Sequence, residues 1–176
     1  MRFEQTPLAG SYLVHLDPRV DARGTFARAF CAQEFSAHAL ETSFVQANIS
    51  TNARAGTVRG MHFQRAPHAE VKLVRCTRGA IYDVIVDMRE GSKTYLRWYG
   101  AELSEENGLM MYVPKGFAHG YQALSDGATA FYMVSAFYGP DSESGLRFDD
   151  PRLAIKWPRA ISEFSDKDAK WPLLPH

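Results

Sequence analysis

The sequence predicts an all-β protein, an antiparallel sandwich or barrel, on three observations. Short runs of alternating apolar and polar residues recur along the chain, as strands with one buried face require. Turn-forming residues separate these runs, for example DARG at 21–24 and SDG at 125–127. Helical periodicity is clear in only one segment before the tail. The predicted strands cover 11–16, 25–30, 44–50, 57–63, 71–77, 80–88, 94–103, 109–113, 119–124 and 129–138.

The predicted helix is short and follows the first strands, at 32–40, AQEFSAHAL. From Asp149 onward the chain is rich in Pro and Trp, so we expect a tail that wraps the barrel, with a short helical turn near 162–168. No internal repeat, low-complexity tract or linker interrupts the sequence. We therefore expect one domain over residues 1–176.

Composition limits the class of function. The chain has 176 residues, and its 20 basic and 20 acidic side chains cancel, so charge gives no argument for a nucleic-acid or membrane partner. Cys31 and Cys76 lack metal-type spacing and are expected to be reduced thiols, although a single disulfide stays open. No apolar run reaches transmembrane length. The expected location is the cytoplasm.

The stretch 57–72 places two polar side chains where a small β protein needs apolar ones. In VRGMHFQ, His62 and Gln64 share one face of the predicted strand, and Met61 occupies the other. Lys72 lies inside the second apolar run, VKLVRC, on the same face as Val74. One inward histidine alone is more often a satisfied core residue than a functional one. Burying a histidine and a lysine together is costly without a use.

Strand parity adds further polar groups to the interior. Asp83 shares its face with Ile81 and Ile85, and the strand 129–138 should point the phenols of Tyr132 and Tyr138 to the same side. Each of these residues alone is more often structural. Together they favour a barrel lumen that serves as a ligand site. The polar interior set is Gln46, Asn48, His62, Gln64, Lys72, Asp83, Tyr132 and Tyr138.

PKGFAH at 114–119 has the form P-x-G-x-x-H, the second sequence motif of the cupin barrels. In many cupins its histidine, here His119, binds a metal with two histidines and a glutamate of the first motif. The first motif here would be His62 and Gln64 followed by Glu70, which leaves a transition metal short of ligands. Lys72 would also repel a cation. We therefore expect no metal.

An ordered series of motifs from about 21–26 to 165–168 resembles the dTDP-4-dehydrorhamnose 3,5-epimerase family. The resemblance implies a metal-free, cofactor-free cupin-type antiparallel jelly-roll barrel that is a homodimer. It also implies epimerisation of a nucleotide-linked 4-keto-6-deoxyhexose at C3 and C5. The motifs are RGMHFQ at 59–64, KLVRCTRG at 72–79, DVIVDMREGSKT at 83–94, ELSEEN at 102–107, PKGFAHGYQAL at 114–124, FY at 137–138, DDP at 149–151, IKWP at 155–158 and SDKD at 165–168.

The resemblance also implies roles for individual residues. His62 would be the base that removes the proton beside the keto group, and Asp168 of the SDKD element would orient it. Tyr132 would be the acid on the opposite face of the sugar, and Lys72 the cation beside the C4 oxygen. Tyr138 would be a further phenol in the pocket.

For the nucleotide and sugar we expect cationic, aromatic and amide side chains. Guanidinium groups suit a diphosphate, and an aromatic ring can stack on the base. Arg59 has the opposite parity to His62, so we expect it to act at the strand end or across a subunit interface. The candidates are Arg23, Arg59, Lys167 and His119 for phosphates and sugar, Phe26 for the base, and Gln46 and Asn48 for sugar hydroxyls.

Three alternatives remain open at this point. The nearest is a relative that epimerises one carbon only, or one that uses a CDP- or GDP-sugar. The second is a metal-dependent cupin, and the third is a sugar-binding module without catalysis. The set of His62, Lys72, Tyr132 and Asp168 argues against the third, because a binding module needs neither a base nor an acid.

Overall fold

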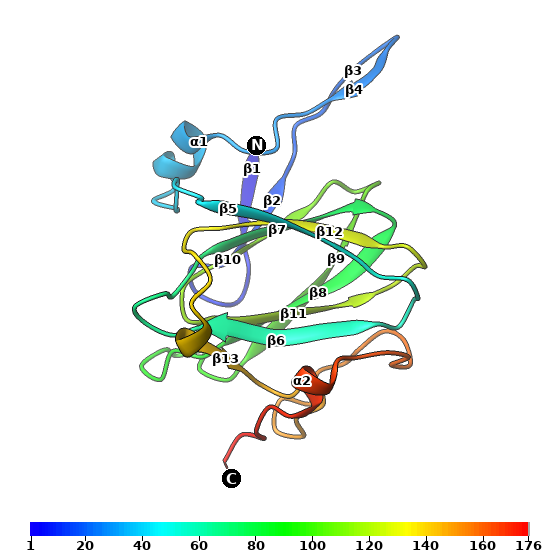
Figure 1. The fold of residues 1–176 in the computed structure, drawn as a ribbon. Coiled ribbons are helices and arrows are strands. Elements are labelled where there is room, and N and C mark those ends of the chain that lie inside the picture. Colours follow the sequence, from blue (N-terminus) through cyan, green and yellow to red (C-terminus); the bar gives the residue numbers. More distant parts are fainter. Residues whose placement is uncertain (176) are drawn as a thin grey trace.

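Two antiparallel sheets face each other in the computed structural model, which describes residues 1–175 (Figure 1). One sheet has six strands, in the order β1 (Arg2–Gln5), β2 (Tyr12–His15), β10 (Met110–Val113), β7 (Lys72–Arg78), β12 (Thr129–Val134) and β5 (Gln46–Thr51). The other has five, in the order β13 (Glu143–Gly145), β6 (Val58–Gln64), β11 (Phe117–Ala123), β8 (Ala80–Asp87) and β9 (Trp98–Ser104). The predicted antiparallel sandwich is confirmed.

The central core fills part of the space between the sheets. Buried apolar side chains from both sheets meet there, among them Val74 and Met111 from one and Ile85, Leu103 and Phe117 from the other. Burial of such a side chain stabilises the fold by roughly 1.5–3 kcal/mol. Polar side chains line the remaining space between the sheets.

The outer face of each sheet has its own cover. The segment around α1 (Ala32–Ala37) packs Phe35 and neighbouring aromatic rings onto the six-stranded sheet. The C-terminal tail packs Leu153 and Ile155 against Met61 and other residues on the five-stranded sheet, and it includes α2 (Asp166–Ala169) beside β6 (Figure 1). The predicted wrapping tail with a short helical turn is therefore confirmed.

A two-stranded hairpin, β3 (Arg19–Asp21) with β4 (Gly24–Phe26), projects from the sandwich (Figure 1). Its apolar side chains are unusually exposed, 76% for Val20 and 71% for Phe26. A two-stranded hairpin is marginally stable by itself in water. The rest of this chain therefore contributes little packing to stabilise the hairpin.

Asp87, at the end of β8, organises the following loop. Its buried carboxylate accepts hydrogen bonds from the Arg89 guanidinium (2.8 Å) and from the hydroxyls of Ser92 (2.5 Å) and Thr94 (2.7 Å). Burial raises the pKa of Asp87, but these hydrogen bonds outweigh burial and hold it well below its ordinary value.

Several predicted boundaries were wrong. The helix predicted to reach residue 40 ends at Ala37, because Ala39 adopts a left-handed conformation (φ 55°) that no helix continues through. The strand predicted over 129–138 ends at Val134, where its pairing with Lys72 of β7 ends. Where strands 25–30 and 94–103 were predicted, the structure has the shorter strands β4 (Gly24–Phe26) and β9 (Trp98–Ser104). The short strands β1, β3 and β13 and the 3₁₀ turn Pro140–Ser142 were not predicted.

Two further observations concern the chain as a whole. Both cysteines are free thiols, as expected. The two α-helices within residues 1–175 have six and four residues, so neither could cross a membrane.

Candidate active site

A polar cavity opens between the sheets and has two lobes. Lobe 1 has a volume of about 430 Å³ and lobe 2 about 280 Å³. Both lobes are lined by His62, Lys72 and Tyr132, which places these three side chains at their junction. His62 comes from β6 of the five-stranded sheet, whereas Lys72 and Tyr132 come from β7 and β12 of the six-stranded sheet. The cavity therefore sets an imidazole on one wall and a phenol and an ammonium on the other.

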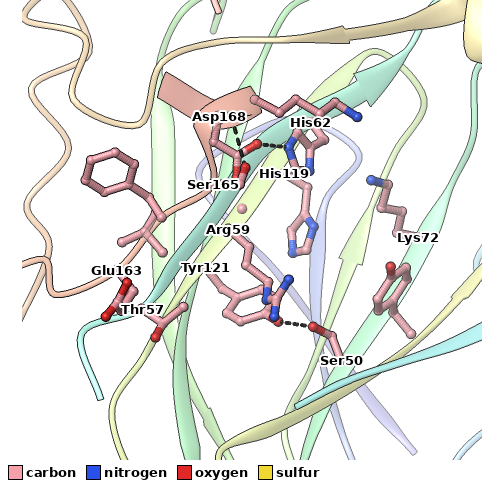
Figure 2. Close-up of a pocket in the computed structure, with 15 residues that line it drawn as sticks. Ser50, Thr57, Arg59, His62, Lys72, His119, Tyr121, Glu163, Ser165 and Asp168 are labelled. Carbon is pink, nitrogen blue, oxygen red and sulfur yellow. Dashed lines mark hydrogen bonds and ion pairs between the residues drawn. The ribbon is translucent and has the colours of Figure 1, made fainter. Parts of the chain in front are cut away.

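Asp168 holds the His62 ring (Figure 2). His62 Nε2 lies 2.5 Å from Asp168 Oδ1, and the Gly60 N–H donates to Asp168 Oδ2 at 3.2 Å. Ser165 caps α2 by accepting from the Asp168 N–H, which fixes the carboxylate at 3% exposure. Burial raises the pKa of Asp168, but the hydrogen bond and charge of His62 outweigh it and the pKa lies below its usual value. The carboxylate is thus ionised and leaves Nδ1 of His62 for a ligand.

A second histidine–carboxylate pair lies beside the first. His119 is the cross-strand partner of His62, and its Nε2 lies 2.7 Å from Asp83 Oδ1. Asp83 is fully buried between Ile81 and Ile85 on β8, as strand parity predicted. Its Oδ2 has no hydrogen-bond partner among residues 1–175.

Lys72 is nearly buried and paired with Glu70. Its Nζ lies 3.3 Å from Glu70 Oε1, and the Gln64 amide donates to Glu70 Oε2 at 3.1 Å. Gln64 Oε1 accepts from the Gly139 N–H at 2.7 Å, so this glutamine ties loops to β6 and is not a free ligand group. Figure 2 shows Lys72 reaching into the cavity from the side opposite His62.

Tyr132 lies inward on β12, as predicted, next to the amides of β5. It is the cross-strand partner of Asn48, and Gln46 donates to Asn48 Oδ1 at 3.0 Å; both amides line lobe 2. Burial raises the pKa of the Tyr132 phenol. The phenol therefore keeps its proton at neutral pH.

Tyr138 reaches lobe 2 by a different route from the predicted one. The shared-face argument with Tyr132 is wrong, because Tyr138 lies beyond the end of β12 in an exposed loop. Its hydroxyl donates to Glu143 Oε2 at 3.0 Å, and the ammonium of Lys167 binds the other oxygen of Glu143. This hydrogen bond raises the pKa of Tyr138, and Glu143 likewise raises the pKa of Lys167. Glu143 links the two predicted residues across the lobes.

Arg59 lines lobe 1 together with His62, so the opposite parity counted from the sequence is wrong. Arg59 is the second residue of β6, and action at the strand end was one of the two routes expected. Pairing between β6 and β11 shifts register between His62 and Arg59: Gly60 and Met61 of β6 stand opposite the single residue Gly120 of β11. One extra residue reverses the alternation, as in a β-bulge. Sequence parity counted a regular strand and so assigned Arg59 to the wrong face.

Arg23 and Phe26 do not line either lobe of this chain's cavity. Both lie on the projecting β3–β4 hairpin, where Arg23 pairs with Asp21 at 2.6 Å and its side chain is 90% exposed. Ten of the twelve predicted site residues are therefore brought together, and these two are not. Lys167, His119, Gln46 and Asn48 line the cavity as predicted.

Sequence reasoning missed several groups of the site. All of them except Phe164 carry a polar group, which was the signal available. Nothing in the sequence paired the missed Glu143 with Lys167, or the predicted Asp83 with His119, since each pair is distant in the chain. Among residues 1–175 no cluster of three or more His, Cys, Asp or Glu side chains is arranged to hold a metal ion. The residues missed are Ser50, Thr57, Tyr121, Glu143, Glu163, Phe164 and Ser165.

A cavity with a carboxylate-held imidazole on one wall and a protonated phenol and a lysine on the other defines an enzyme of proton transfer, of the isomerase class. Residues 5–176 match the family model described as dTDP-4-dehydrorhamnose 3,5-epimerase. The chain belongs to that family.

Individual relatives agree along nearly their whole length. The chain is 43% identical over 175 residues to "dTDP-4-dehydrorhamnose 3,5-epimerase" of Sinorhizobium fredii, covering 99% of this chain and 90% of the relative. It superposes with a TM-score of 0.95 and 40% identity on the Bacillus anthracis enzyme of the same name, solved with TDP and PPi bound, covering 98% and 99% of the chains. It is 38% identical to a Streptomyces niveus "dTDP-4-dehydrorhamnose 3-epimerase", covering 99% of this chain and 84% of the relative. The predicted family, cupin-type jelly roll and epimerase class are confirmed.

Proposed function

We propose that this protein epimerises a dTDP-linked 4-keto-6-deoxyhexose at C3 and C5. The observation that carries the proposal is the placement of His62, held by Asp168, on one sheet and of Tyr132 and Lys72 on the facing sheet. A sugar ring between these walls offers one face to the base and the other to the acid.

The chemistry follows from the keto group at C4, which acidifies the hydrogens on C3 and C5. His62 Nδ1 takes one of these protons, and the electron pair of the C–H bond moves to the C4 oxygen as an enolate. The ammonium of Lys72 stabilises that oxygen. Tyr132 donates its proton to the carbon from the other face, which inverts the centre. The phenolate then regains a proton and the imidazolium loses one, through solvent, before the next cycle.

Deuterium exchange tests the proposal. In deuterium oxide, dTDP-4-keto-6-deoxyglucose should take up solvent deuterium at both C3 and C5. His62→Asn should slow this exchange by about 10²–10⁴-fold, as loss of a general base does. Tyr132→Phe should retain exchange while losing inversion, and Tyr95→Phe, a phenol outside both lobes, should behave as wild type. A His62→Asn variant with near-normal exchange would refute the assignment of the base.

A single-carbon epimerase is the second candidate. It is supported by the 38% identity to the Streptomyces niveus relative named as a 3-epimerase. Deuterium at C3 alone in the wild-type product would establish this candidate and exclude the two-carbon reaction.

We also propose a homodimer in which the β3–β4 hairpin of one subunit reaches the cavity of its partner. The exposure of Val20 and Phe26 and the absence of Arg23 from this chain's own cavity support that arrangement. Arg23 would then add a cation for the diphosphate, and Phe26 a ring for the base.

Mixing two inactive variants tests this dimer. In a symmetric dimer with composite sites, subunits carrying Arg23→Ala and His62→Asn recombine, and about a quarter of all sites regain both native residues. Activity should therefore reappear on mixing and subunit exchange. A monomer by sedimentation equilibrium, or exchanged subunits without recovered activity, would contradict the proposal.

Two broader expectations remain proposals. One domain over residues 1–176 is supported by the interleaving of early and late strands, such as β10 between β2 and β7. A cytoplasmic location is supported by the two free thiols.

A further inference from the structure

The cations of the cavity differ in how they are balanced. His62, His119, Lys72 and Lys167 each have a carboxylate partner, respectively Asp168, Asp83, Glu70 and Glu143. Arg59 has no carboxylate within 4 Å among residues 1–175, although its side chain is exposed in lobe 1. It is therefore the cavity cation whose charge the described chain leaves uncompensated.

Neutral groups hold Arg59 in place. Its Nε donates to the Asn52 side-chain oxygen at 2.8 Å, and one terminal nitrogen lies 3.5 Å from the Thr51 carbonyl oxygen. A guanidinium has five N–H donors, so most of them stay free for a ligand. Because an amide oxygen carries no net charge, this contact orients the fork without neutralising it.

Asn52 is itself fixed on every side. It is 1% exposed, and its amide nitrogen donates to the Ala128 carbonyl at 2.9 Å and to the Tyr121 hydroxyl at 3.3 Å. The Tyr121 hydroxyl in turn donates to Ser50 Oγ at 2.9 Å, in the wall of lobe 1 (Figure 2). These bonds leave the Asn52 side-chain oxygen facing Arg59. The orientation of the guanidinium thus rests on a buried network from three elements.

We propose that Asn52 is a positioning residue for substrate binding: it holds Arg59 in one orientation, with its charge uncompensated, as the receptor for the diphosphate. The proposal rests on the proposed function, since it takes the ligand to be a nucleoside diphosphate. Rigid presentation lowers the entropy cost of forming paired N–H···O bonds to phosphate. A carboxylate at position 52 would have the same shape but would compensate the charge that the diphosphate needs.

Asn52→Asp provides the test, because it changes charge with almost no change in volume. TDP binding is measured by titration calorimetry, and kcat and KM by deuterium uptake. Asn52→Asp should weaken TDP binding and raise KM by about tenfold or more, while kcat stays within about threefold, since the diphosphate takes no part in the proton transfers. Asn107→Asp, an equally isosteric change in the β9–β10 turn, should alter neither.

Two further variants separate the possible failures. Arg59→Ala should lose at least as much TDP affinity as Asn52→Asp; unchanged affinity in Arg59→Ala would overturn the diphosphate assignment itself. Unchanged TDP affinity in Asn52→Asp, with affinity lost in Arg59→Ala, would overturn the role of Asn52 and leave the proposed function intact. If Asn52→Asp does not fold, Tyr121→Phe removes one anchor of Asn52 and should raise the Kd for TDP by about threefold; no rise would refute the network.

Discussion

Replacing Asp168 by asparagine should invert the tautomer of His62, the proposed base. The Asp168 carboxylate accepts two hydrogen bonds, from His62 Nε2 at 2.5 Å and from the Gly60 N–H at 3.2 Å. An asparagine has one oxygen and one NH₂ group. Because the Gly60 N–H can only donate, the oxygen must face Gly60 and the NH₂ must face His62. Nε2 then becomes an acceptor, and the proton moves to Nδ1, where the substrate proton should be received.

The size of this effect can be set from comparable chemistry. An Asp→Asn change that imposes the wrong histidine tautomer in a catalytic triad lowers kcat about 10⁴-fold. That loss corresponds to roughly 5 kcal/mol of transition-state stabilisation. Asp168→Ala imposes no tautomer and leaves space for water. It should therefore be more active than Asp168→Asn, although the alanine variant removes more of the native contact.

Initial rates of deuterium uptake, with TDP affinity as the control for an intact site, would test the order wild type, Asp168→Ala, Asp168→Asn. Asp166→Asn, an exposed residue of the same short helix, serves as the matched control and should keep wild-type rates. An Asp168→Asn variant within tenfold of wild type, or more active than Asp168→Ala, would refute the tautomer argument.

Three further outcomes are expected. Activity should survive dialysis against a chelator, because the Gln64 amide is engaged in structural hydrogen bonds and is not free to bind a metal. A loss of activity that zinc, iron or manganese restores would contradict this. Asp87→Asn should lower the free energy of unfolding by about 3 kcal/mol near neutral pH. Because the pKa of Asp87 is depressed in the folded state, its carboxylate stabilises the fold above the ordinary value of 3.8, and this stabilisation is lost as pH falls. Urea titrations should therefore show a smaller difference in stability between wild type and Asp87→Asn in acid than near neutral pH. Gly145→Ala should cost about 1–3 kcal/mol, since an added Cβ would lie 2.4 Å from the Trp171 ring; Gly91→Ala, with open space around it, should be neutral in the same thermal melts.

Alternation along the strands predicted most of the interior correctly. Gln46, Asn48, His62, Lys72, Asp83 and Tyr132 all face the space between the sheets, because the strands that carry them are regular where these residues lie. Side chains alternate between the two faces of a regular strand, so alternation predicts only the face on which a residue lies. It therefore identified residues in the walls of the cavity, but not which of them pair across it.

Alternation failed where the backbone is irregular or the strands are short. Arg59 was misassigned because one extra residue in β6 is invisible in the order of residue types. Tyr138 was reached by extending β12 four residues past its last pair at Val134. The strands β1, β3 and β13 were missed because they are short and their residues carry little alternation, RFEQ, RVD and ESG. Asp168 came only from the family resemblance, since no local pattern links it to a histidine 106 positions away.

That separation has a consequence for the timing of activity during synthesis. The strands of both sheets are complete by Gly145, so the sandwich, His62, Lys72 and Tyr132 all emerge from the ribosome before Asp168, the residue proposed to orient the base. The tail then lies with Glu163 beside Thr57 and Val58, and α2 brings Asp168 to His62. A nascent chain can thus form the strands that carry Lys72 and Tyr132 first and receive Asp168 last. The proposed proton transfer therefore requires that the C-terminal tail has packed against β6.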